Sequence, residues 1–221
     1  MNNSLRFTAL ALAAAALLAS TQAQAGTITY HFDVNTSTLG VGASASSSPF
    51  YLDFQLNYGS GTGNSATIGN LTFTGGSLTG APNLFGNASG DLGTAALLSA
   101  DSVNAFNEIF QQFSPGTSLG FDVSLTSNST DLTPDAFAFA ILDKSTFQIP
   151  TTDPLGISLV QADIGTSGIT LNSYAGVGDY DGVTVNVTPV PEASTSTLGL
   201  MAVSMVALGV FRARKSVKQA A

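Results

Sequence analysis

The stretch that decides the fold is FYLDFQLNY at residues 50–58, where apolar and polar side chains alternate without a break. Side chains of a β-strand point alternately to the two faces of a sheet, so this pattern predicts a half-buried antiparallel strand. Tyr51 and Asp53 are expected on its outward face. The side chains expected to point inward are Phe50, Leu52, Phe54, Leu56 and Tyr58.

The same alternation recurs on both sides of this stretch. It predicts strands at residues 27–34, 119–125 and 183–188, and weaker patterns predict strands near residues 71–74, 84–92 and 155–162. Residues 136–142 are apolar at nearly every position, which is typical of a central strand covered on both faces. Eight or more strands joined by Gly, Asn and Ser turns predict an all-β fold, a single β-sandwich with jelly-roll-like topology.

One segment departs from the period of two. Val103, Phe106, Phe110 and Phe113 recur at intervals of three or four residues, and Pro115 follows them. This spacing predicts one short amphipathic helix that lies over a sheet and ends before the proline.

Charge excludes several classes of function. The 221 residues hold 6 Lys and Arg, 14 Asp and Glu, one His and no Cys, and residues 26–188 hold 13 of the acids but only Lys144, for a net charge of −12. Binding to nucleic acid phosphates needs basic residues that this span lacks. Disulfides, structural zinc and thiol catalysis need cysteine.

The N-terminus has the pattern of a signal peptide at residues 1–25. Arg6 precedes an apolar stretch at residues 7–19, and Ala23 and Ala25 form the small-x-small pattern that signal peptidase cleaves. The sequence therefore predicts export, with cleavage after Ala25. The alternative is a buried N-terminal helix.

Residues 189–221 combine three features in a fixed order. They are the motif Val190-Pro191-Glu192-Ala193, an apolar stretch at about 195–211, and a basic tail at 212–218 with Arg212, Arg214 and Lys215. A helix over the apolar stretch would be about 25 Å long, against a hydrocarbon core of about 30 Å. The positive-inside rule keeps the basic tail cytoplasmic and places residues 26–188 outside.

This C-terminal order resembles the PEP-CTERM sorting signal of Gram-negative bacteria, although Ala193 stands where the second proline of Pro-Glu-Pro is usual. The resemblance implies an exported protein that is held transiently in the inner membrane and processed by an exosortase. It also implies a final place at the cell surface or in the extracellular matrix, in association with exopolysaccharide and biofilm. An ordinary C-terminal membrane anchor is the alternative.

Few residues point to chemistry. His31 is expected to be solvent-exposed, and no Gly-x-Ser-x-Gly motif accompanies it. Glu108, on the predicted helix, and Asp53 and Asp122, on outward strand positions, are expected to be surface carboxylates. No resident cofactor is expected.

The one candidate metal site is an Asp-x-Asp-Gly turn. Asp179 and Asp181 could offer carboxylates to calcium, although the favoured interpretation is a plain β-turn before the strand at residues 183–188.

The sequence is compatible with three functions. The first is a non-enzymatic exported protein of the cell surface or matrix, whose partners are signal peptidase, the exosortase and, after export, exopolysaccharide. The second is a carbohydrate-binding module that stacks sugars on tyrosines such as Tyr51, Tyr174 and Tyr180. The third is a glycoside hydrolase or lyase that uses Glu108.

Overall fold

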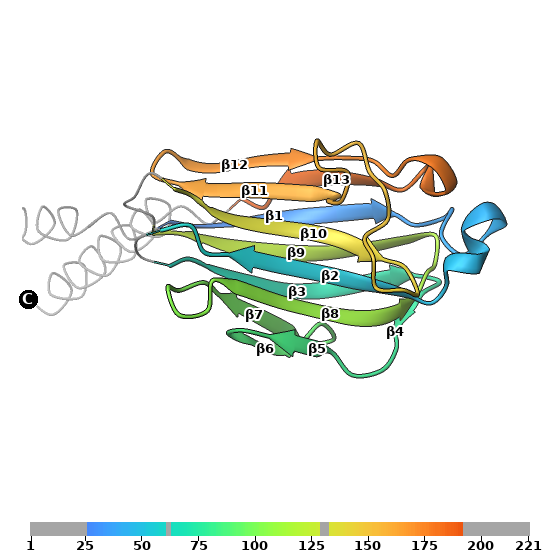
Figure 1. The fold of residues 1–221 in the computed structure, drawn as a ribbon, viewed down its shortest axis with the longest axis horizontal. Helices are drawn as coiled ribbons and strands as arrows, with labels where there is room; N and C mark the ends of the chain where they lie inside the picture. Colours follow the sequence, from blue (N-terminus) through green and yellow to red (C-terminus); the bar gives the residue numbers. More distant parts are fainter. Residues whose placement is uncertain (1–25, 61–62, 129–132, 192–221) are drawn as a thin grey trace, which may run out of the picture. The chain divides into compact units, whose positions relative to one another are not determined.

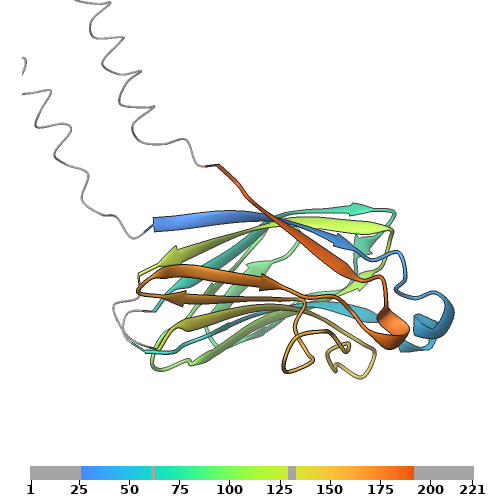
Figure 2. The ribbon, with the colours of Figure 1, turned by 90° about the horizontal axis from the view of Figure 1, so that it is seen from above.

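The computed structural model describes residues 26–60, 63–128 and 133–191. Two antiparallel sheets pack face to face as a β-sandwich, and Figure 1 and Figure 2 show the two layers. The predicted signal peptide, with Ala23 and Ala25, and the chain from Glu192 onward lie outside the described residues. Among the residues described, no helix is long and apolar enough to span a membrane.

The first sheet has six strands. In spatial order they are β13 (Thr184–Pro189), β1 (Gly26–Asn35), β9 (Ser118–Ser127), β3 (Ser65–Thr74), β7 (Ala95–Ser99) and β6 (Ala88–Asp91). The second sheet has seven. Six of them, in spatial order, are β12 (Gly168–Ser173), β11 (Val160–Gly165), β10 (Asp135–Leu142), β2 (Phe50–Asn57), β8 (Phe106–Ser114) and β4 (Ser77–Leu78). The seventh, β5 (Asn83–Phe85), also pairs with β8.

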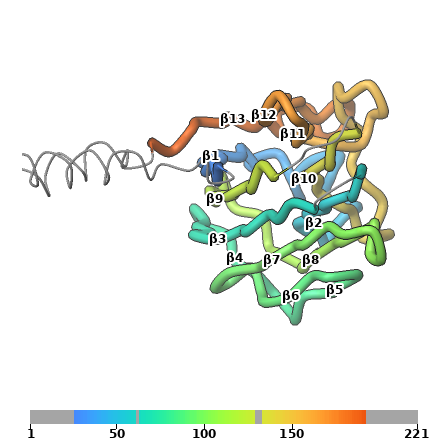
Figure 3. Tube along the Cα trace, turned by 90° about the vertical axis from the view of Figure 1, so that its left-hand side faces the viewer, coloured from blue at the N-terminus to red at the C-terminus, as the bar shows by residue number. Residues whose placement is uncertain are grey.

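Phenylalanines from both inner faces meet between the sheets. The ring centroid of Phe121 on β9 lies 5.0 Å from that of Phe32 on β1, 5.1 Å from that of Phe54 on β2 and 5.0 Å from that of Phe139 on β10. All four rings are fully buried. Figure 3 shows the two layers from one end, with β1 and β9 in one and β10 and β2 in the other.

The alternation of residues 50–58 is confirmed as strand β2. Phe50, Leu52, Phe54 and Leu56 are all 0% exposed. The strands predicted at residues 27–34, 119–125, 136–142 and 183–188 correspond to β1, β9, β10 and β13. β10 lies inside its sheet, between β11 and β2, as expected of a strand that is apolar on both faces.

The predicted amphipathic helix is wrong, because the segment forms strand β8. Its inward positions alternate apolar and polar residues, and the amides of Asn107 and Gln111 are buried there. Asn107 Nδ2 donates to Leu56 O at 3.1 Å, and Gln111 Nε2 donates to Gly80 O at 2.9 Å. Phenylalanines also occupy the outward positions 106 and 110. The apolar residues therefore do not alternate along the segment, and their spacing resembles that of a helix.

The two ends of the sandwich differ. β1 begins at Gly26 and runs antiparallel to β13, with Tyr30 opposite Pro189, so both ends of the described domain emerge at the same end. The short 3₁₀ helices η1 (Gly42–Ser47) and η2 (Gly178–Tyr180) lie at the opposite end (Figure 1).

Tyr180 is part of this opposite end and is not available for stacking a sugar. It is 8% exposed, its ring packs edge-on against Phe50, and its hydroxyl donates to Ser47 Oγ at 2.9 Å. The expectation of an exposed loop tyrosine at this position is therefore wrong.

The phenylalanine cluster predicts a large loss of stability on truncation. Phe121→Ala removes the ring that touches the other three and leaves a cavity, at an expected cost of about 3–5 kcal/mol in the free energy of unfolding. Phe147→Ala is the control, since Phe147 is 70% exposed and should change stability little. Urea denaturation followed by circular dichroism measures both, and equal effects of the two variants would contradict the assigned core.

Candidate functional site

Aromatic rings gather around one carboxylate on the outer face of the seven-stranded sheet, the face that points away from the other sheet. Glu108 is on β8, with Phe106 and Phe110 two positions before and after it on the same face. In the strand register Phe85 of β5 lies opposite Glu108 on one side, and Gln55 of β2 lies opposite on the other. Phe85, Phe106 and Phe110 are called the aromatic frame below.

Two rings of the frame, Phe85 and Phe110, are in contact, and the frame remains open to solvent. The centroids of Phe85 and Phe110 are 6.1 Å apart with an interplanar angle of 14°. Tyr51 extends the group, with its ring centroid 5.9 Å from that of Phe110 at 81°. Phe85 is 50% exposed and Phe106 48% exposed. Adjacent half-exposed rings on a regular sheet face form an apolar surface against which a flat ligand can pack.

A buried carboxyl group lies directly beside the frame. Asp53 is 1% exposed, in register between Ala140 of β10 and Phe110 of β8. Gln55 Nε2 donates to Asp53 Oδ2 at 2.8 Å and to Glu108 Oε1 at 3.2 Å. No N–H or hydroxyl donor reaches Asp53 Oδ1.

Burial and then the charge of Glu108 raise the pKa of Asp53 to about 8. The pKa of Glu108 is also raised, chiefly by burial. The Asp53 and Glu108 side chains hydrogen-bond to each other, and such a bond requires that one of the two carboxyl groups keeps its proton. Because Asp53 is the more deeply buried, it holds the proton at neutral pH.

The structure therefore corrects the interpretation of these two acids as surface carboxylates. Asp53 does point to the outer face of its sheet, but neighbouring side chains cover it. Glu108 lies on a strand, not on a helix, and is half-buried. The sheet brings them together although 54 positions separate them in the chain.

His31 lies on the outer face of the other sheet and is confirmed as solvent-accessible, with 38% of its side chain exposed. Its Nδ1 lies 2.6 Å from Asp122 Oδ1, and its Nε2 lies 3.4 Å from Asp33 Oδ1. The hydrogen bond to Asp122 is the main cause that raises the pKa of His31. With a carboxylate rather than a hydroxyl at Nε2, the imidazole is not placed to activate a serine.

The Asp179 and Asp181 region forms a turn. Both side chains are exposed, Asp181 N–H donates to Gly178 O at 3.1 Å, and Val183 N–H donates to Tyr180 O at 3.0 Å. Nowhere in the described parts of the chain do three or more His, Asp or Glu side chains gather as metal ligands. Among the described residues, no third acidic or imidazole side chain joins the two aspartates.

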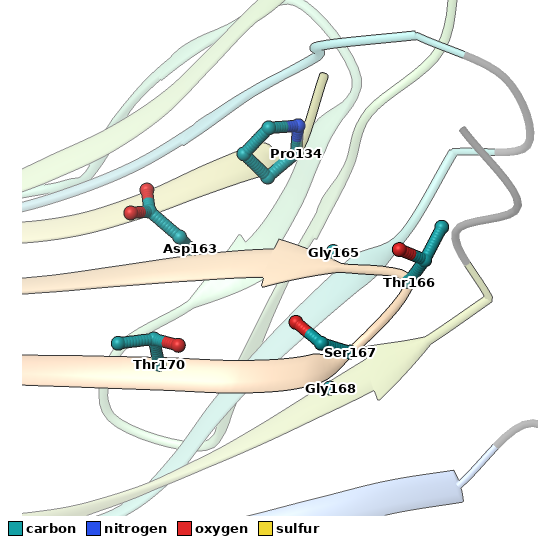
Figure 4. Close-up of a pocket in the computed structure, with 7 residues that line it drawn as sticks. All are labelled: Pro134, Asp163, Gly165, Thr166, Ser167, Gly168 and Thr170. Carbon is teal, nitrogen blue, oxygen red and sulfur yellow. The ribbon is translucent and has the colours of Figure 1, made fainter. Parts of the chain in front are cut away.

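A small hollow of about 150 Å³ lies at the turn between β11 and β12 (Figure 4). Pro134, Asp163, Gly165, Thr166, Ser167, Gly168 and Thr170 line it. Asp163 is the one ionisable group in this lining, and the lining has no aromatic ring. The hollow is thus lined mainly by hydroxyl groups and glycine backbone. It lacks the combination of aromatic rings and carboxyl groups found around Glu108.

Comparison with protein-family models, curated proteins and solved structures finds no match to this chain.

Sequence reasoning singled out Tyr51, Asp53 and Glu108 but missed the aromatic frame. The signal that could have found Phe106 and Phe110 is their spacing of two residues on either side of Glu108, once the segment is taken as a strand. Phe85 could not be found this way, because only the pairing of β5 with β8 brings it to Glu108.

The buried Asp53 predicts a stability that depends on pH. The folded protein holds the Asp53 proton up to about pH 8, whereas the unfolded chain loses it near its ordinary pKa of 3.8. The folded state therefore binds more protons between these values, and its stability falls as the pH rises through them. At pH 9 the Asp53→Asn variant should be more stable than the wild type by about 1–3 kcal/mol, because it buries no charge.

The measurement is urea unfolding at pH 5 and pH 9, where the advantage of Asp53→Asn should shrink at the lower pH. Asp163→Asn is the matched control, since it removes a carboxylate that is exposed on the same sheet. Its difference from the wild type should be the same at both pH values. An Asp53→Asn variant that behaves like this control would contradict the assignment.

Proposed function

We propose that the chain is an exported, non-enzymatic protein of the cell surface or extracellular matrix, sorted by an exosortase and associated with exopolysaccharide. The observation that carries this proposal is the common position of the two ends of the domain. β1 begins at Gly26, next to the predicted signal peptide, and the antiparallel β13 ends at Pro189, next to Val190 of the sorting motif. A domain attached at one end presents its opposite loops, η1 and η2, away from the attachment.

The path of the chain supports an exported binding scaffold. Strands β1, β2 and β3, and again β7, β8, β9 and β10, alternate between the two sheets. We infer from this alternation a jelly-roll-like topology, an architecture that lectin domains also use. Fold alone does not determine function, so the assignment depends on the sorting segment and the aromatic face.

The sorting segment predicts where the protein accumulates. A chain that ends at Pro189 lacks the motif, the apolar stretch and the basic tail, so it should pass into the medium without a membrane-bound precursor. Fractionation of the producing cells with an antibody against the domain measures this. Deletion of residues 219–221, beyond the basic tail, is the control and should leave the precursor in the membrane. Equal membrane retention of both truncated chains would contradict the proposed signal.

A second function, carbohydrate binding, is favoured by the outer face of the seven-stranded sheet. Phe85, Phe110 and Tyr51 offer adjoining ring surfaces, Phe106 adds a ring on the same face, and Gln55 and Glu108 offer hydrogen-bonding groups beside them. Apolar ring faces bordered by a few polar groups are the usual lining of a small-molecule site. Carbohydrate binding is compatible with the first proposal, because a matrix protein needs a surface that binds the matrix.

The carboxyl pair favours binding over hydrolysis. Retaining glycosidases hold their two carboxyl groups about 5–5.5 Å apart and inverting enzymes hold them farther apart, so that a sugar carbon or a water fits between them. Asp53 and Glu108 hydrogen-bond to each other, and Asp53 is covered. The two carboxyl groups therefore cannot lie on opposite sides of a glycosidic bond, as hydrolysis requires.

The aromatic face predicts retention on polysaccharide. Phe110→Ala removes the ring that contacts both Phe85 and Tyr51. It should reduce retention of the exported protein on the producer's exopolysaccharide by about tenfold, which corresponds to about 1.4 kcal/mol. Phe147→Ala, an equally large truncation at a ring 70% exposed in a loop, is the control. Co-sedimentation measures both. Unchanged retention of Phe110→Ala would contradict a glycan site on this face.

A further inference from the structure

The aromatic frame surrounds a negative charge that no cation of the described chain balances. In the ranges 26–60, 63–128 and 133–191 the one lysine is Lys144, and these ranges hold no arginine. Lys144 Nζ donates to Ser46 O of η1 at 2.6 Å. His31 is on the other sheet. Glu108 thus lies on a face with no basic partner.

Asp53 leaves the acidic pair with a single charge. Its Oδ1 is buried and receives no N–H or hydroxyl donor from the described residues, and its carboxyl group hydrogen-bonds to Glu108. While Asp53 keeps its proton, the pair carries one negative charge, and this charge lies beside half-exposed phenyl rings.

Three phenyl rings and a carboxylate are a setting that favours a ligand ammonium group. Ring faces attract cations, and a carboxylate among them adds a charge-assisted hydrogen bond. A neutral sugar could stack on the rings but would leave Glu108 without a counter-ion. An acidic sugar would face both Glu108 and a span with a net charge of −12, with no basic side chain to receive it.

We propose that the aromatic frame binds a hexosamine unit whose amino group is free and protonated, with the ammonium on Glu108 and the sugar ring against Phe85 and Phe110. The inference rests on the proposed carbohydrate binding of this face and names its sugar class. Asp53 is a positioning residue here, because it is covered and acts through its hydrogen bond to Glu108.

A sugar chain fits this face better than a lysine side chain does. The ring surface continues past the frame to Tyr51, and the amides of Gln55, Asn57 and Gln112 lie on the same side of the sheet. Neutral amides beside rings match the hydroxyls and flat faces of consecutive sugars. A lysine side chain would occupy the frame and leave these groups unused.

The test compares two ligands with the same sugar backbone, one with free, charged amino groups and the other with neutral acetamido groups. A β-1,4-linked glucosamine tetramer and the same tetramer fully N-acetylated are titrated by calorimetry into the full-length exported protein at pH 6. The free amine should bind about tenfold more tightly, as expected of one charge-assisted hydrogen bond. In Glu108→Gln this preference should fall to about one, while the weak binding of the acetylated tetramer remains. A lysine tetrapeptide is the third ligand and should bind more weakly than the glucosamine tetramer.

A matched variant distinguishes binding at the aromatic frame from nonspecific attraction of a cationic ligand to an acidic domain. Asp163→Asn removes a carboxylate of the same face outside the frame and should keep the tenfold preference. Loss of the preference in Asp163→Asn as much as in Glu108→Gln would overturn the proposal, and so would tighter binding of the lysine peptide that depends on Glu108.

The outcomes also separate this inference from the proposed carbohydrate binding. Equal binding of the two tetramers, abolished by Phe110→Ala, would retain a glycan face and overturn its selectivity for the amine. If neither the tetramers nor the producer's exopolysaccharide binds, carbohydrate binding itself fails.

Discussion

The packing of Phe121 against Phe32, Phe54 and Phe139 is the contact on which the rest of the structure depends. Phe32 and Phe121 are on one sheet, Phe54 and Phe139 are on the other, and ring centroids 5.0–5.1 Å apart fix how the sheets face each other. Once Phe54 is inward, the pleat of β2 sends Asp53 and Gln55 outward. The chemistry of the outer face is thus a consequence of the register of the core.

Strand β8 connects the core to the candidate site through an unusual distribution of residues. It places amides inward, where Asn107 and Gln111 bond backbone carbonyls, and phenylalanines outward at positions 106 and 110. An amphipathic strand built only for stability would have the opposite arrangement. Residues that contradict the pattern expected for stability are common where function constrains a sequence. In β8 these residues lie on either side of Glu108.

The sequence was sufficient to predict the sandwich and the inner face of β2, because burial of alternate side chains requires apolar and polar residues to alternate along a strand. It was insufficient at residues 103–113, where Asn107 and Gln111 occupy inward positions and the pattern imitates a helix. The burial of Asp53 was also out of reach, since it results from Phe110 and Ala140 on two other strands. The export and sorting segments remain predictions from the sequence, because they lie outside the described residues.

The two outer faces of the sandwich differ in a way that argues for one partner surface. On the six-stranded sheet, Thr29 bonds Ser124, and His31 and Asn70 bond Asp122, so polar side chains satisfy one another. On the seven-stranded sheet, half-exposed rings lie beside the carboxylate of Glu108, which no cation of the described residues balances. Scattered exposed apolar residues need no explanation, but a contiguous group bordered by polar side chains marks an interaction site. Because this group is confined to one face and lies against an unbalanced carboxylate, it is better explained as a surface made for a ligand than as a defect of packing.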